Sequence, residues 1–206
     1  MVDNILYSEN TPFGTEFFPK VQENSNREKT LFNPKTSEYL RINTDDLILG
    51  IEIDNDFEKK FKWIKDDVLP YFQNILFKNY GLKNIRRLGI IFSHKIEKNS
   101  KLSTAVTSLT ENEITEADNI SISFSKKAPA TEALFRKGVN DYKNRIYNFQ
   151  ELKEFVNTDL DFQYYYEPAI EDLRECFAEK ILDEAKNFLE NNVYIWLSKY
   201  DTEKDK

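Results

Sequence analysis

The chain has 206 residues, of which 40% are hydrophobic and 14% aromatic, and this content of core-forming residues excludes a disordered protein. Its 29 Lys and Arg residues against 36 Asp and Glu residues give a formal charge of −7, which argues against broad binding to nucleic acids or membrane surfaces. One Cys and one His exclude an intramolecular disulfide framework, a Cys-based zinc site and any metal motif that needs two histidines. The N-terminal residues lack a signal-peptide pattern, and no apolar run is long enough to span a membrane. We therefore expect a cytoplasmic protein.

Residues 1–36 are expected to form an irregular segment that packs on the body of the protein. Pro and Gly residues interrupt this segment, and its middle is polar. Three aromatic residues are expected to attach it to the body: Phe13, Phe17 and Phe18. Residues 37–200 are then expected to form a single α+β domain, followed by a charged tail over residues 201–206.

The first half of this domain predicts a hairpin and then a helix. The expected strands are 39–42 and 47–53, and residues 43–46 form the turn between them. Leu and Ile alternate along the second strand and give it an apolar face, with Gly50 as a bulge or a point of close approach. The apolar period then becomes helical from Phe57 to Leu76. Pro70 is expected to kink or restart this helix.

The second half predicts strands over residues 86–96, 119–125, 142–149 and 153–166, of which the last two form a hairpin. Between the first two lies a polar loop over residues 97–118, with room for a short strand near 102–109. Residues 126–137 read as a basic connection. The longest helix is expected to begin at Pro168, because Pro is favoured in the first turn of a helix.

Together these elements predict a single, mostly antiparallel sheet with two long helices on one face. Residues 51–57 and 156–162 both carry the pattern Asp-x-Asp-Phe before an expected helix. This similarity indicates either two ββα repeats or a coincidence of short sequences.

The expected elements follow one another in a recognisable order. A helix comes first, then the strand Arg87-Leu88-Gly89-Ile90-Ile91, a polar loop, an Asp-Leu-Asp strand and a long final helix. This succession resembles a sporadically distributed microbial protein family of unknown function, over residues 40–197. The resemblance implies an α+β fold and no particular activity. The patchy distribution of such a family is compatible with mobile or defence-related genes.

Four carboxylates are candidate metal ligands, since alternate residues of a strand share a face. These are Asp54, Asp56, Asp159 and Asp161. If their strands are neighbours, they could hold Mg²⁺ or Mn²⁺ and activate water for phosphodiester hydrolysis. The alternative is that such residues cap helices.

Five basic residues interleaved with aromatic residues form a candidate surface for single-stranded nucleic acid, through phosphate pairing and base stacking. They are Lys126, Lys127, Arg136, Lys137 and Arg145. The alternative is an ordinary solvated surface, which the negative net charge favours. The single His94 is a candidate general base, or a residue at the edge of the core.

The remaining candidates are aromatic residues that favour a protein interface. They are Tyr164, Tyr165 and Tyr166 on an expected strand, and Tyr194 and Trp196 at an apolar helix end. No nucleotide-binding, serine-hydrolase or zincin motif is present, so we predict no catalytic residue and no cofactor. The leading hypothesis is a non-catalytic module that binds another protein chain or itself, such as an inhibitor, immunity or accessory protein. A metal-dependent phosphodiesterase or nuclease and a single-strand nucleic-acid binder are the alternatives.

Overall fold

The computed structural model describes ten stretches of the chain. These are residues 11–14, 16–25, 27–43, 45–53, 55–74, 83–97, 120–129, 139–151, 155–172 and 177–195. The chain divides into two compact units, Met1–Gly81 and Leu82–Lys206. Each unit contains a four-stranded antiparallel sheet and helical segments, so the α+β class is confirmed.

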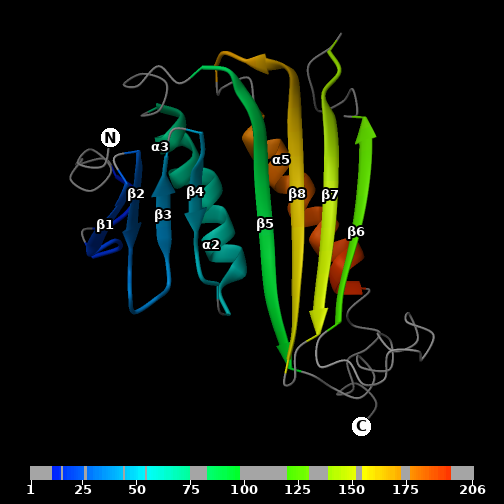
Figure 1. Ribbon diagram of the computed structural model, residues 1–206, viewed down its shortest axis with the longest axis horizontal. Helices are drawn as coiled ribbons and strands as arrows, with labels where there is room; N and C mark the ends of the chain where they lie inside the picture. Colours follow the sequence, from blue (N-terminus) through cyan, green and yellow to red (C-terminus); the bar gives the residue numbers. More distant parts are fainter. Residues whose placement is uncertain are drawn as a thin grey trace. The chain divides into compact units, whose positions relative to one another are not determined.

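The sheet of the first unit is a meander, in which each strand pairs with its neighbours in the sequence (Figure 1). Its strands are β1 (Lys20–Ser25), β2 (Glu28–Phe32), β3 (Tyr39–Ile42) and β4 (Leu47–Gly50). The predicted hairpin is confirmed, since β3 pairs with β4. Asn43 closes its turn: its Oδ1 accepts the backbone N–H groups of Asp45 and Asp46, both at 2.7 Å.

One face of this sheet carries the hydrophobic core of the first unit. Leu31 and Leu40 are opposite each other in the ladder, and both are fully buried. The three predicted attachment residues belong to this core, where Phe13 and Phe18 are buried and Phe17 is partly buried. The prediction that these aromatic residues hold the N-terminal segment in place is therefore confirmed.

The helical segment of this unit changes its hydrogen-bonding pattern just before Pro70. It consists of α2 (Phe57–Trp63), the π-helical segment Ile64–Val68 and α3 (Leu69–Asn74). Pro70 has no N–H to donate to the preceding turn, and wider π turns accommodate such interruptions. The predicted disturbance at this proline takes the form of a π-helical turn. Val68, Tyr71 and Phe72 supply the helical side of the core.

The second unit has longer strands in the order β5-β8-β7-β6. They are β5 (Ile85–Glu97), β6 (Ile120–Pro129), β7 (Tyr142–Glu151) and β8 (Phe155–Ile170). The predicted β7–β8 hairpin is confirmed. The first strand of the unit pairs with the last, so that Ile90 lies opposite Phe162.

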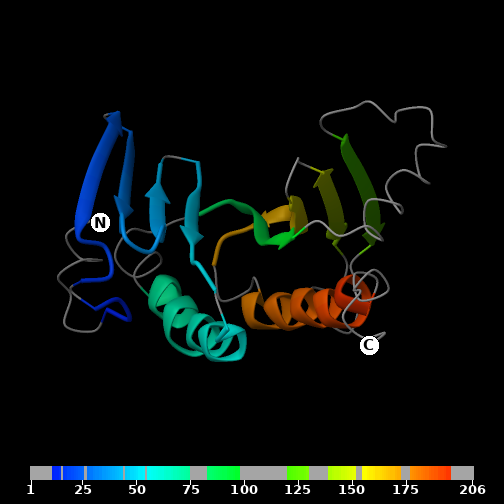
Figure 2. The same cartoon turned by 90° about the horizontal axis from the view of Figure 1, so that it is seen from below.

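One face of the second sheet is covered by α5 (Ala178–Phe188) and the π-helical segment Leu189–Tyr194, as Figure 2 shows for α5. The predicted apolar stripe is confirmed in Ile181, Leu182, Ala185 and Leu189, all buried. From the sheet, alternate residues of β8 complete this core. They are Val156, Leu160, Phe162 and Tyr164. Full burial of one such side chain contributes roughly 1.5–3 kcal/mol.

Several expectations about organisation need correction. The described strands form two sheets instead of one. A ββα duplication is not confirmed, because β4 lies at the edge of its sheet whereas β8 lies between two strands. Residues 1–36 are not irregular throughout, since β1 and β2 fall within them. The boundary between the two compact units lies near residue 81, within the stretch 37–200 that we expected to be a single domain.

Two element boundaries also differ. Pro168 does not open a helix: β8 continues to Ile170, which is buried and pairs with Ile85. The helix begins at Ala178, after Phe177 in the left-handed conformation. Lys126 and Lys127, expected in a connection, lie in β6. The expected strand near 102–109 and the tail 201–206 lie outside the described residues.

Candidate functional site

The best candidate site is the face of the second sheet opposite α5, which we call the open face. Between Arg87 and Lys95, the side chains that β5 directs to it are exposed: Arg87, Ile91, Ser93 and Lys95. From β8 come the odd-numbered residues of Phe155–Tyr165, and from β7 the even-numbered residues of Tyr142–Gln150. In Figure 2 no described helix or strand of this unit lies against this face.

A row of cations and aromatic rings crosses the open face at one end. The rings of Tyr165 and Tyr142 are stacked, with centroids 4.6 Å apart and planes at 12°. The ammonium of Lys127 lies 3.7 Å from the centroid of the Tyr142 ring. On the other side Arg87 is the cross-strand partner of Tyr165. The row therefore has a positive charge at each end and two stacked rings between them, and the cation–π contact of Lys127 with Tyr142 stabilises it.

Next to this row, a chain of hydrogen bonds runs along β8. The Tyr165 hydroxyl donates to Oε1 of Gln163 at 2.7 Å, and Nε2 of Gln163 donates to Oδ2 of Asp161. Burial raises the pKa of Asp161, the Gln163 hydrogen bond and the Arg87 charge lower it, and the Asp159 charge raises it. The net effect is an upward shift, so this carboxylate is less stable in its ionised form than a free one.

The open face also has an apolar part beside this polar chain. Ile91, the cross-strand partner of Asp161, is 63% exposed. Gly89 lies two residues before it, and a Cβ there would meet no atom within 4 Å. At the far end the Lys95 ammonium lies 3.9 Å from the centroid of the Phe155 ring. The face thus combines an exposed aliphatic side chain with aromatic rings and paired charges.

The structure describes three of the four predicted metal ligands, Asp56, Asp159 and Asp161. Asp159 and Asp161 share the open face of β8, as the alternation predicted. Asp56 belongs to the other unit, where it takes the N-cap position of α2 without a side-chain capping bond, and Asp54 lies outside the described residues. Among the residues described, no three His, Cys, Asp or Glu side chains gather closely enough to hold a metal ion. The four-carboxylate site stays a prediction.

Of the predicted partner-binding tyrosines, two are part of the core. Tyr164 is fully buried and Tyr166 is 5% exposed, so burial corrects the prediction that they contact a partner. Tyr165 points to the open face. Tyr194 is 36% exposed at the end of the last helix, and Trp196 lies outside the described residues.

The predicted basic surface is divided between the two faces of the sheet. Lys127 belongs to the open face, whereas Arg145 points toward the helix, with its guanidinium 4.6 Å from the centroid of the Phe188 ring. Lys126 is the cross-strand partner of Arg145 and shares its face. Arg136 and Lys137 lie outside the described residues. The described members therefore do not form one continuous basic patch.

His94 lies on the face of the sheet that α5 covers, at the edge of the core. This agrees with the sequence, in which His94 and Phe92 are alternate residues of one strand. The His94 ring makes an edge contact with Tyr194 at 5.5 Å between centroids. Burial lowers its pKa, and the charge of Asp159 opposes this shift. Its neighbour Ser93 points to the open face, so the two cannot form a catalytic dyad.

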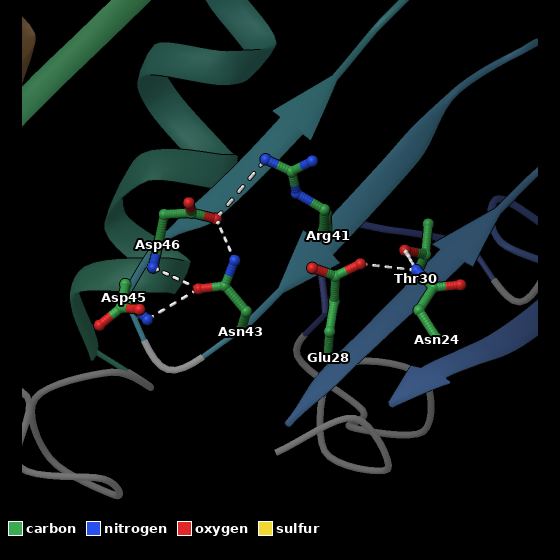
Figure 3. Close-up of polar contacts among 7 residues, drawn as sticks. All are labelled: Asn24, Glu28, Thr30, Arg41, Asn43, Asp45 and Asp46. Carbon is green, nitrogen blue, oxygen red and sulfur yellow. Dashed lines mark hydrogen bonds and ion pairs between the residues drawn. The ribbon is translucent and has the colours of Figure 1, made fainter. Parts of the chain in front are cut away.

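Polar contacts in the first unit are structural. Asn43 donates from Nδ2 to Asp46 at 2.8 Å, and Arg41 lies 3.8 Å from the same carboxylate (Figure 3). On the same face Asn24 donates to Thr30 at 3.1 Å. These bonds fix the β3–β4 turn and the β1–β2 connection, and they present no arrangement suited to catalysis.

Sequence reasoning missed two residues of the second unit. Gln163 shares the parity of Asp161 and Tyr165, and this alternation could have placed it on the open face. Asp141 is 6% exposed and accepts hydrogen bonds from Tyr164 and the backbone N–H of Glu167. Nothing local in the sequence distinguishes it from the other aspartates.

No helix in the described stretches has both the length and the apolar character needed to cross a bilayer. No protein-family model, curated protein or solved structure matches this chain.

Proposed function

We propose that this chain is a non-catalytic protein-binding module, of the inhibitor, immunity or accessory type, that acts in a microbial cytosol. The observation that carries the proposal is the open face of the second sheet, with Ile91 63% exposed midway along its edge strand β5. Protein interfaces concentrate apolar and aromatic contacts at their centre and leave charges at the rim.

The distribution of side chains on this face supports a protein partner. Ile91 and the Tyr142–Tyr165 pair offer a rigid contact area with few rotatable bonds. The charged residues around them are of both signs, Arg87 and Lys127 against Asp159 and Asp161. A partner with complementary charges at its own rim would fix the orientation of the complex. The sheet itself provides a backbone that binding need not rearrange.

The test is native mass spectrometry of tagged protein recovered gently from the cells that make it. Ile91→Glu introduces a charge on the apolar part of the open face, where the side chain is already exposed and folding should be preserved. Val21→Glu, at a 46% exposed position of β1, is the matched control. We expect a stoichiometric second protein with the unsubstituted chain and the control, and its loss with Ile91→Glu. Equal recovery of the partner by all three would refute the assignment of this face.

The row of Lys127, Tyr142, Tyr165 and Arg87 supports a second candidate, binding of single-stranded nucleic acid. Aromatic rings on an open sheet with flanking cations can stack bases and pair with phosphates. The nearby Asp159 and Asp161 and the net charge of −7 oppose it. Fluorescence anisotropy with a labelled oligothymidylate tests it: binding should weaken with salt and with Lys127→Glu. Binding insensitive to both would exclude the electrostatic mechanism.

A further inference from the structure

Among the described strands, the outer edge of β6 has no partner, and its composition is unusual. In the order β5-β8-β7-β6, β6 pairs with β7, and no other described strand adjoins it. Its first six residues, 120–125, carry no charge and alternate Ser with Ile or Phe. Phe124 within this stretch is 53% exposed. Such an edge can accept another strand, because no described strand pairs with the N–H and C=O groups on that side.

The other described edges carry features that discourage strand addition. β1 includes Lys20 and Glu23 and has an irregular register after Glu23. β4 has only four residues. β5 has Arg87 and Lys95 on either side of its apolar part and Gly89 within it, and glycine weakens a strand. In β6 the comparable residues, two Lys and one Pro, are confined to the C-terminal end.

We propose that two copies of this chain associate by antiparallel pairing of their β6 strands, which joins the two second-unit sheets into one. A two-fold axis perpendicular to the sheet joins each face of one copy to the same face of the other. Residues that lie opposite each other then point to the same face, so both have odd numbers or both have even numbers, and the two numbers sum to an even number. An axis at Phe124 pairs nine residues of each copy and places the two exposed Phe124 rings opposite each other. Aromatic cross-strand pairs of this kind stabilise sheets.

The two lysines of β6 exclude two of the alternative registers. An axis at Lys126 or Lys127 would place a lysine directly opposite its own copy, and like charges directly opposite destabilise a sheet. With the axis at Phe124, Lys126 is opposite residue 122 and Lys127 is opposite Ser121, both uncharged. In this register a second copy therefore places no like charges directly opposite each other along the edge. The pairing uses the strand edge and leaves the open face available, so it is independent of the proposed function.

Light scattering across a range of protein concentrations, together with native mass spectrometry, tests the proposal. The unsubstituted chain should show a concentration-dependent dimer. Ser121→Lys places two like-charged pairs across the axis and should raise the dimer dissociation constant by about tenfold. Ser93→Lys, also exposed but on β5, is the matched control and should leave it unchanged. A chain that stays monomeric, or a dimer that Ser121→Lys leaves intact, would overturn the proposal.

Oxidative cross-linking tests the register separately. Phe124→Cys should form an intermolecular disulfide, because residues directly opposite have Cβ atoms about 4.5–5.5 Å apart and small shifts bring them within bonding distance. Ser125→Cys should not, since it lies opposite Ser123 of the second copy. The unsubstituted chain, whose only cysteine is Cys176, gives the background. Cross-linking through position 125 and not through 124 would overturn the proposed axis.

Discussion

The Tyr164 hydroxyl donates a hydrogen bond to the buried carboxylate of Asp141, with 3.0 Å between Oη and Oδ2. The other carboxylate oxygen accepts the backbone N–H of Glu167 at 2.7 Å. Asp141 directly precedes β7, so this residue joins the start of one strand to the end of the next.

Removal of this carboxylate should therefore be costly. Asp141→Ala removes the acceptor of a buried hydroxyl and of a backbone N–H, and we expect it to lower the free energy of unfolding by about 3 kcal/mol. Tyr164→Phe removes only one of the two bonds and should cost about 1–1.5 kcal/mol. Urea denaturation of both variants measures these values. A change below about 0.5 kcal/mol for Asp141→Ala would contradict the structural role assigned to it.

The Lys143–Glu184 ion pair should behave as a buried pair. It links β7 to α5, and the side chains are 10% and 24% exposed. Lys143→Ala leaves Glu184 without its counter-ion in a largely buried position, and we expect a loss of about 3 kcal/mol. The double variant Lys143→Met with Glu184→Leu should be more stable than Lys143→Ala. Lys186 and Glu190, a more exposed helix pair, provide the control, with a coupling below about 0.5 kcal/mol in a double-mutant cycle.

His94 should make stability depend on pH below its ordinary pKa of 6.5. Burial lowers its pKa in the folded protein, so the unfolded chain binds this proton more readily. The contribution of His94 to the free energy of unfolding is then complete above pH 6.5. It decreases as the pH falls toward the pKa of His94 in the folded protein. His94→Gln should flatten this part of the profile, measured by urea denaturation at a series of pH values. The raised pKa of Asp161 acts in the opposite direction at lower pH, because the folded form then binds its proton more tightly. An unchanged slope in His94→Gln would show that another group is responsible.

Two glycines should respond oppositely to the same substitution. A Cβ on Gly50 would lie 2.3 Å from Cε1 of Tyr39, whose ring covers this position from the neighbouring strand. Gly50→Ala must displace the ring, and we expect a loss of about 1 kcal/mol that disappears when Tyr39 is Ser. Gly89→Ala meets no atom within 4 Å and should be neutral or stabilising, because alanine restricts the unfolded chain. Thermal unfolding of Gly50→Ala, Tyr39→Ser, the double variant of these two and Gly89→Ala decides between these outcomes.

The sequence predicted individual elements better than their assembly. Alternation identified β6, and the apolar stripe identified α5, because each pattern depends on residues close together in the chain. The division into two sheets could not be predicted in this way. β5 pairs with β8 through contacts such as Ile90 with Phe162, and no local pattern records which distant strand a given strand joins. The Pro168 prediction was wrong because the strand-forming residues of β8 continue past a signal that favours helix initiation elsewhere.

The candidate site was predicted only in part, for a related reason. Alternation showed that Tyr165 and its two neighbours point to opposite faces, but it did not show which face the last helix covers. That helix buries Tyr164 and Tyr166 and leaves Tyr165 beside Tyr142. The position of α5 therefore determines which face of the sheet is open. That position depends on tertiary contacts, which the tyrosines alone do not indicate.

The different strand orders of the two sheets have a consequence for folding during synthesis. In the first unit every strand pairs with the next, so its sheet can form as soon as about eighty residues have left the ribosome. β5 must instead wait until β8 has been made, because β8 is its described partner. Non-local pairing of this kind slows folding and leaves apolar strand surface exposed meanwhile. The second unit is thus the part of the nascent chain that depends most on protection from aggregation.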